Sequence, residues 1–258
     1  MNYRMMGRFV AQILAIEAVF MLPAMMISIY DRDERAIFGF AATIGVVFLV
    51  VAVLSAVTRR TRRGFYARDG LTCVAVGWIV MSLLGALPFY LSGEIPHYVD
   101  ALFEIVSGFT TTGSSILVDV ERMSRGLLYW RSFSHWLGGM GVLVFLLAIA
   151  PSGGRSGGFT MHLMRAESPG PDVGKLVPKI RQTAMILYVI YIALTGIDIL
   201  FLLAGRMPVF DALCTAFGTA GTGGFGIKAD SLAGYSPYIQ NVTTVFMLLF
   251  GVNFSCYY

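Results

Sequence analysis

Residues 100–114 read DALFEIVSGFTTTGS, and residues 211–225 read DALCTAFGTAGTGGF. The two stretches form an internal repeat, because they match without a gap at Asp100/Asp211, Ala101/Ala212, Leu102/Leu213, Thr111/Thr222 and Gly113/Gly224. Upstream, a Gly-x-x-Pro motif precedes both stretches after a one-residue gap. Internal repeats are a common way to build transport proteins.

Each stretch predicts a short helix followed by an extended segment. Asp100 and Asp211 fit the N-cap of a helix, where a carboxylate accepts hydrogen bonds from free backbone N–H groups. About ten moderately apolar residues follow, which are too few to cross a bilayer, and then a run of Thr and Gly. Irregular backbone at membrane depth must be buried in protein or line a water-filled cavity. We therefore expect two hairpins that enter a membrane as a helix and continue as an extended strand lining a pore.

The composition is that of an integral membrane protein. Of the 258 residues, 57% are hydrophobic and 13% are charged, which is about half the charged share of soluble domains. The mean hydropathy is +0.73. A soluble fold would have to expose large apolar patches, and a disordered chain would contain few apolar residues. The three Cys residues are odd in number and far apart, which argues against a disulfide scaffold.

Six stretches are long and apolar enough to cross a bilayer as helices of roughly 20 residues. They lie at about 9–30, 36–57, 71–91, 127–150, 183–205 and 240–258. The run from Val46 to Val53 is apolar on every face, which predicts a helix rather than an alternating barrel strand. The sequence thus predicts an all-α polytopic membrane protein, with each hairpin between a pair of spans.

The basic residues predict the orientation of these spans. The N-terminus, the connection after the second span and the segment 151–182 carry twelve of the 19 Lys and Arg residues. All three lie on one side of the predicted membrane, so we expect that side, with the N-terminus, to be cytoplasmic. Basic loops facing anionic lipid account for the net charge of +4, and no nucleic acid is needed to explain it.

The Thr/Gly segments are candidates for a cation selectivity filter. Backbone carbonyls can replace part of an ion's hydration shell, and Gly tolerates the positive φ that turns a carbonyl toward a pore. The negative C-terminal end of each short helix would favour a cation there. The candidate filter residues are Thr111, Thr112, Gly113, Thr222, Gly223 and Gly224. The ungapped repeat makes Gly224 the equivalent of Gly113, with Gly223 as the alternative. The competing interpretation of both segments is a glycine-bearing turn between helices.

Ionisable residues inside apolar segments are functional candidates. We interpret Glu17 and Asp198 as paired structural groups within their spans. Glu104, in the first short helix, either attracts cations or forms hydrogen bonds within the scaffold. Arg131 and His135 lie one turn apart on the same predicted helix. We interpret His135 as a packing residue and leave open whether Arg131 lies near the outer mouth.

Several motifs together resemble the Trk/Ktr/HKT superfamily of potassium transporters, most closely the TrkH-type membrane subunit of bacteria. They are FTTTGS at 109–114, TGGF at 222–225, WLGGMG at 136–141, RAESPGP at 165–171 and RDG at 68–70. The glycines of the third motif allow close helix packing or act beside the pore.

The resemblance implies two leading transmembrane helices followed by four helix–pore loop–helix repeats of potassium-channel type around one ion path. On this chain it places the leading helices at 1–58, the first repeat at 71–151, a cytoplasmic connector at 152–182 and the second repeat at 183–258. Two of the expected four repeats are present, and the chain stops inside its sixth span. We therefore expect either a part of a longer protein or two halves that associate.

The resemblance further implies potassium uptake, with potassium as the transported substrate and no cofactor. Gly113 fits the glycine that the family associates with potassium preference. A sodium-permeable or ion-coupled cation symporter of the same family is the alternative. A membrane-embedded enzyme is a remote one, because His97, His135 and His162 are scattered. Implied partners are the lipid bilayer of the bacterial inner membrane, a second copy of the chain and a cytosolic nucleotide-binding regulatory subunit of TrkA type.

Overall fold

The computed structural model describes residues 3–58, 67–141 and 180–257, and every regular element in these ranges is a helix. The longer helices are α1 (Tyr3–Tyr30), α2 (Glu34–Val57), α3 (Ala67–Gly85), α6 (Arg125–Met140), α9 (Ile180–Ala204) and α11 (Pro237–Gly251). The shorter ones are α4 (Leu87–Leu91), α5 (Tyr98–Phe109), η1 (Val120–Arg122), α10 (Val209–Ala220) and η3 (Phe254–Tyr257). The all-α prediction is confirmed.

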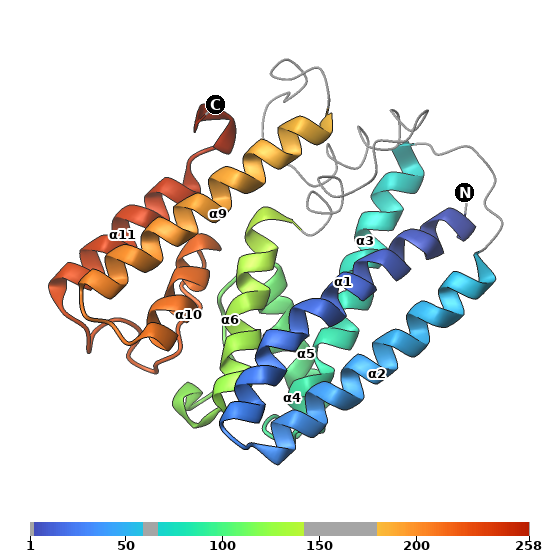
Figure 1. The fold of residues 1–258 in the computed structure, drawn as a ribbon, viewed down its shortest axis with the longest axis horizontal. Helices are drawn as coiled ribbons and strands as arrows, with labels where there is room; N and C mark the ends of the chain where they lie inside the picture. The colour runs from blue at the N-terminus through green and yellow to red at the C-terminus, as the bar shows by residue number, and fades with distance from the viewer. Residues whose placement is uncertain (1–2, 59–66, 142–179, 258) are drawn as a thin grey trace.

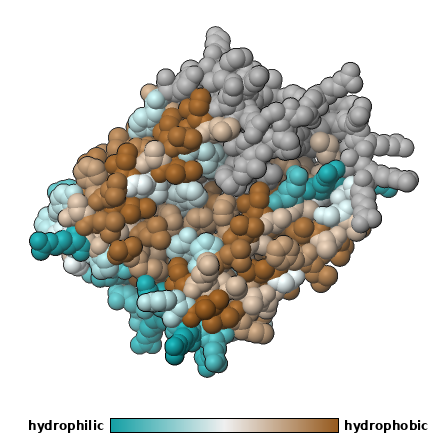
Figure 2. All heavy atoms as spheres, in the orientation of Figure 1, coloured by the Kyte–Doolittle hydropathy of each residue, from teal (hydrophilic) through white to brown (hydrophobic). Residues whose placement is uncertain are grey.

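Four segments have the length and hydropathy of membrane-crossing helices, namely Tyr3–Tyr30, Glu34–Val57, Thr72–Leu91 and Ala184–Ala204. Large hydrophobic side chains are exposed along several of them, for example Phe48 and Leu49 on α2 and Val189 and Leu200 on α9. Hydrophobic residues cover most of the face seen in Figure 2 that is not grey, and hydrophilic residues gather along its lower edge. Such a surface suits lipid around the helices and water beyond their ends.

The predicted spans have somewhat different bounds in the structure, and α1 begins at Tyr3 rather than at about residue 9. The span at 71–91 is divided into α3 and α4 at Ala86, because Pro88 has no N–H to continue the first helix. The last span begins at Pro237 and ends as a helix at Gly251, before the turn η3. Helix α6 ends at Met140, and the rest of the span predicted at 127–150 lies almost wholly outside the described residues, as does most of the connector at 152–182.

The two short helices form as the repeat predicts, but the position expected for their Asp residues is wrong. Helices α5 and α10 both have 12 residues, and neither N-cap residue, His97 or Pro208, makes a side-chain capping bond. Asp100 and Asp211 instead lie in the first turn, at the third helical position of each. A carboxylate there still interacts favourably with the positive end of the helix dipole.

Helix α6 lies between two parts of the molecule, one made of helices α1 to α5 and the other of helices α9 to α11 (Figure 1). It packs against α1 and α5 on one side and against α10 on the other. Helices α9 and α11 pack against each other and against α10, while α2 packs against α1 and α4. The two hairpin helices, α5 and α10, are therefore neighbours of the same central helix, although they are far apart in the sequence.

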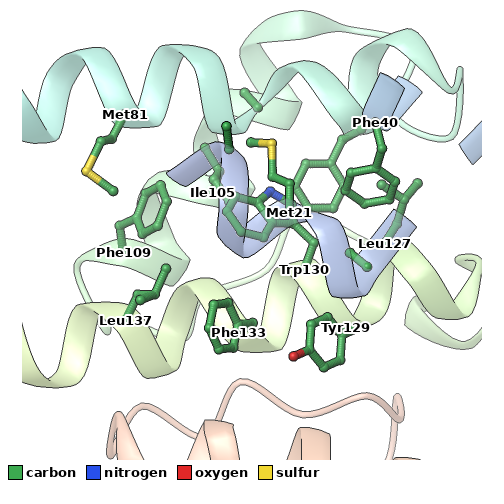
Figure 3. Packing of buried hydrophobic residues seen from close by; sticks show 14 of the residues in the cluster. Met21, Phe40, Met81, Ile105, Phe109, Leu127, Tyr129, Trp130, Phe133 and Leu137 are labelled. Carbon is green, nitrogen blue, oxygen red and sulfur yellow. The ribbon is translucent and has the colours of Figure 1, made fainter. Parts of the chain in front are cut away.

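Aromatic side chains of α6 form the core on both sides of this helix. Trp130 is fully buried, and its Nε1 donates a hydrogen bond to the carbonyl of Gly85 at 3.0 Å, close to the break between α3 and α4. Figure 3 shows Trp130 on the side of Ile105 and Met21, and Phe133 one turn further along α6, where the two ring centroids lie 6.5 Å apart. There Phe133 meets Phe217 of α10, with ring centroids 5.4 Å apart. The core thus fixes α6 against both halves.

Candidate ion-conducting site

The two Thr/Gly loops have the same unusual backbone. Thr111 and Gly113 have φ angles of 52° and 75°, and Thr222 and Gly224 have φ angles of 57° and 69°. Positive φ is uncommon for Thr. Its recurrence at Thr111 and Thr222 therefore shows that the two loops share one backbone conformation. The loops are therefore conformational repeats, and Gly224 rather than Gly223 is the backbone equivalent of Gly113, as the ungapped alignment predicts.

The first loop uses its N–H groups internally and leaves carbonyls free. The N–H groups of Thr111 and Thr112 donate to the carbonyls of Gly108 and Ser107, each at 3.0 Å. The hydroxyl of Ser107 reaches the carbonyl of Ser114 at 2.5 Å. Within the described ranges, no hydrogen bond is donated to the carbonyls of residues 111 to 113. These oxygens are available to a cation at the C-terminal end of α5.

The second loop is held by a side chain as well as by its own backbone. The N–H of Thr222 donates to the carbonyl of Thr219 at 2.9 Å, and the N–H of Gly223 donates to Nε2 of His135 at 3.2 Å. The carbonyl of Gly224 accepts from the N–H of Gly226 at 2.8 Å. In the part of the chain that the structure describes, the carbonyls of Thr222 and Gly223 accept no hydrogen bond.

The loops touch each other. A Cβ atom added to Gly113 would overlap the carbonyl oxygen of Gly223, and one added to Gly223 would stand 2.6 Å from the carbonyl oxygen of Thr111. In each loop, a carbonyl oxygen that accepts no hydrogen bond among the described residues therefore lies against a glycine of the other loop. Backbone carbonyls without a hydrogen-bond donor are the groups that can replace part of a cation's hydration shell.

Two glycines of α6 bring this helix against both loops. A Cβ on Gly138 would overlap the carbonyl of Phe109, the last residue of α5. A Cβ on Gly139 would stand 2.5 Å from the Tyr191 hydroxyl oxygen and 3.2 Å from the carbonyl oxygen of Ala220, the last residue of α10. Gly138 and Gly139 therefore permit close packing of α6, and they do so beside the start of each loop.

Glu104 belongs to the scaffold behind the first loop. Its carboxylate is fully buried and accepts from the Ser115 hydroxyl at 2.8 Å, the Ile116 N–H at 3.0 Å and Arg131 Nε at 2.6 Å. These donors satisfy both carboxylate oxygens. The hydrogen-bonding alternative is the one that the structure supports, since the carboxylate faces the backbone that follows the loop.

Arg131 is 2% exposed and contacts the residues that follow the second loop. Its Nη1 donates to the carbonyl of Gly226 at 2.7 Å, and its guanidinium carbon lies 3.5 Å from the ring centroid of Phe225. His135 stacks on the same Phe225 ring, with centroids 5.2 Å apart. His135 therefore does more than pack, because it also accepts from the second loop.

The comparisons with known proteins assign the family. The model of a family described as TrkH, cation transport protein, matches residues 36–258. The chain belongs to this TrkH family. It is 35% identical to the Trk system potassium uptake protein TrkH of Vibrio parahaemolyticus, over all of this chain and 53% of the relative. It is 34% identical to TrkG of Escherichia coli K12, over 92% of this chain and 49% of that one.

A solved structure agrees with this assignment. The potassium transporter TrkH from Vibrio parahaemolyticus matches with a TM-score of 0.83 and 29% identity, covering all of this chain and 51% of the solved chain. An archaeal protein, an uncharacterized cation transporter of Methanocaldococcus jannaschii, is 30% identical over 93% of this chain and 48% of its own. The TrkH-family chain spans about half the length of the curated relatives it matches.

One expectation about the charged residues of this TrkH-family chain is wrong. Glu17 and Asp198 are both fully buried, but neither carboxylate has a hydrogen-bond partner among the described residues. Glu17 lies on α1 next to Gly85, where a Cβ would stand 2.9 Å from its Oε1. Pairing failed as a prediction because the apolar pattern locates a residue in a span but does not reveal which side chains face it.

Sequence reasoning missed Ser115 and Phe225 as parts of the TrkH-family site. Ser115 binds Glu104, and Phe225 supplies the ring between Arg131 and His135. Phe225 stands at the end of the repeated stretch, so its position was a usable signal. The described residues contain no group of three or more His, Cys, Asp or Glu that could hold a metal ion.

Proposed function

We propose that the two loops form part of a potassium-selective pathway, with Thr111, Thr112, Gly113, Thr222, Gly223 and Gly224 as filter residues. The observation that carries the proposal is the contact of the two loops at Gly113 and Gly223, together with carbonyl oxygens on both loops that accept no hydrogen bond among the described residues. The C-terminal ends of α5 and α10 lead directly into these loops, and their negative dipole ends favour a cation. Potassium uptake is in the names of the bacterial relatives. Transport, not enzymatic turnover, is the function we infer.

A sodium-permeable or ion-coupled symporter of the same family is the second candidate. Carbonyl ligands bind sodium as well as potassium, and selectivity depends on how rigidly they are spaced. We favour potassium because Gly113 keeps the first loop in its positive-φ conformation and against the second loop. The described residues hold two of the four loops that a complete ring of this type uses.

We infer the membrane, the orientation and the partners of this protein from its charge distribution and from its relatives. The protein would be a multi-pass component of a bacterial inner membrane with a cytoplasmic N-terminus, because basic residues concentrate on that side. A second copy and a cytosolic nucleotide-binding subunit are the proposed partners, with the connector at 152–182 as the docking segment. The proposed units of the chain remain the leading helices at 1–58, the first repeat at 71–151, the connector at 152–182 and the second repeat at 183–258.

The experiment is ion uptake by the full-length protein in cells that lack their own potassium uptake systems. The wild type should restore growth at low potassium and prefer potassium over sodium in reversal potentials. Gly113→Ser should lower this preference at least tenfold, because the side chain collides with the Gly223 carbonyl. Gly196→Ser is the matched control, since a Cβ at that helical glycine meets nothing within 4 Å. An unchanged preference in Gly113→Ser would contradict the filter assignment.

A further inference from the structure

We propose that Arg131 is a positioning residue that holds both pore loops in one arrangement and thereby sets ion selectivity. This inference rests on the proposed function, because selectivity has meaning only if the loops conduct ions. Arg131 lies on α6, and α6 packs against both hairpin helices. Its side chain makes one set of contacts toward each loop.

Toward the first loop, Arg131 acts through Glu104. The ion pair measures 2.6 Å from Nε to Oε1, and both side chains are at most 2% exposed. The same carboxylate accepts hydrogen bonds from the Ser115 hydroxyl and the Ile116 N–H, and these two residues lie just after the candidate filter. Moving the guanidinium would therefore displace the backbone at the exit of the first loop.

Toward the second loop, Arg131 contacts the backbone without an intermediary. Its Nη1 donates to the Gly226 carbonyl at 2.7 Å, and the N–H of the same Gly226 donates to the Gly224 carbonyl at 2.8 Å. The guanidinium also covers the ring of Phe225. One planar cation thus holds residues 225 and 226, immediately after the second Thr/Gly segment.

Among the described residues, the second repeat has no ion pair of its own at the place that corresponds to Glu104 and Arg131. With the offset that aligns the loops, Glu104 corresponds to Thr215. Counted from the N-cap residues Ser124 and Ser236, Arg131 corresponds to Thr243. Thr215 and Thr243 both line a cavity of about 90 Å³ behind the second loop. The second loop therefore depends on the arginine of the first repeat.

A stabilising role alone explains this arrangement poorly. Burying an ion pair costs desolvation energy that its attraction only partly offsets, and apolar replacements of such pairs are often as stable. What the guanidinium offers is geometry, because its planar fork can bond Glu104 and Gly226 at the same time. A Lys ammonium is a point charge on a flexible stem and cannot reproduce both bonds while covering Phe225.

The test compares three variants of the full-length protein, Arg131→Lys, Glu104→Gln and Arg125→Lys. Arg125 is the matched control, since it lies on the same helix, pairs with Asp31 at 3.1 Å and stands over the Phe210 ring, away from the loops. Potassium-to-sodium permeability ratios come from reversal potentials. We expect a loss of at least tenfold for Arg131→Lys and for Glu104→Gln, no additional loss in their double variant, and less than a twofold change for Arg125→Lys.

A second readout separates positioning from folding. The thermal midpoint of purified protein is measured in potassium chloride and in sodium chloride of equal concentration. Wild type should be more stable in potassium, and Arg131→Lys should lose this difference. A merely structural arginine would lower both midpoints equally and leave the difference intact, which would overturn the proposal, as would unchanged selectivity. A wild type without any preference for potassium would instead refute the proposed function.

Discussion

Gly113 and Gly223 lie in direct contact, with the carbonyl oxygen of Gly223 in the place that a side chain on Gly113 would occupy. The two residues belong to different repeats and lie 110 positions apart in the sequence. Their contact means that neither loop has an independent shape. A substitution in one loop should therefore shift the other loop as well, and change the ion preference of the pathway that we propose they form.

Gly223 and Gly224 should respond differently to a methyl group. Gly224→Ala meets nothing within 4 Å but must hold a φ of 69°, which costs about 1 kcal/mol. Gly223→Ala keeps an ordinary φ but would place its Cβ 2.6 Å from the Thr111 carbonyl oxygen and overlap the ring of His135. We expect the larger fall in potassium-to-sodium permeability ratio from Gly223→Ala. A larger fall in Gly224→Ala than in Gly223→Ala would show that backbone strain, not loop contact, controls selectivity.

The close approach of α6 can be tested by overpacking. Gly138→Ala and Gly139→Ala should each lower the thermal midpoint, because added methyl groups in packed regions cost roughly 1–3 kcal/mol. Gly45→Ala, where a Cβ has no neighbour within 4 Å, should leave the midpoint unchanged or raise it slightly. The measurement is thermal unfolding in detergent. Midpoints for Gly138→Ala and Gly139→Ala that match the Gly45→Ala midpoint would exclude close packing at α6.

Two threonines that line the cavity behind the second loop, Thr243 and Thr219, should change the stability of the protein in opposite directions when replaced by Val. The Thr243 hydroxyl is buried without a hydrogen-bond partner among the described residues, so Thr243→Val should stabilise the protein by about 1 kcal/mol. The Thr219 hydroxyl donates to the Thr215 carbonyl at 2.8 Å, so Thr219→Val should destabilise it by a similar amount. Thermal midpoints of both variants test this. Destabilisation by Thr243→Val would reveal a partner for that hydroxyl.

Glu94, in the connection between α4 and α5, makes the stability of the protein depend on pH. Burial raises the pKa of this carboxyl above its ordinary value of 4.5, although the Ser124 N–H that it accepts at 3.0 Å acts in the opposite direction. A raised pKa means that the folded state holds the proton more tightly. Its contribution to stability is complete below pH 4.5 and is lost as the pH rises through the raised pKa.

Glu94→Gln should remove this dependence while keeping an oxygen that can accept from Ser124. Thermal midpoints between pH 4 and pH 8 should therefore fall less with rising pH in the variant than in wild type. At pH 7 the variant should be at least as stable as wild type, because no charge is buried. A parallel pH profile for both proteins would assign the dependence to another group.

Sequence patterns were sufficient for the features that depend on local chemistry. Apolar runs located the long helices α1, α2 and α9, and the repeat located α5, α10 and the loops after them. The matched φ angles of Gly113 and Gly224 follow from the same repeat. Each of these depends on neighbours close along the chain, where spacing and residue type carry the information.

Tertiary structure alone decided which groups face each other across repeats. No pattern connects Arg131 to Gly226, His135 to Gly223 or Gly113 to the Gly223 carbonyl. Those contacts arise because α6 packs against both α5 and α10, which depends on small residues and aromatic surfaces meeting in space. For the same reason an apolar run placed Glu17 inside a helix and left its surroundings undetermined. Sequence thus predicts two loops of filter type, and packing around one helix brings the two loops into contact.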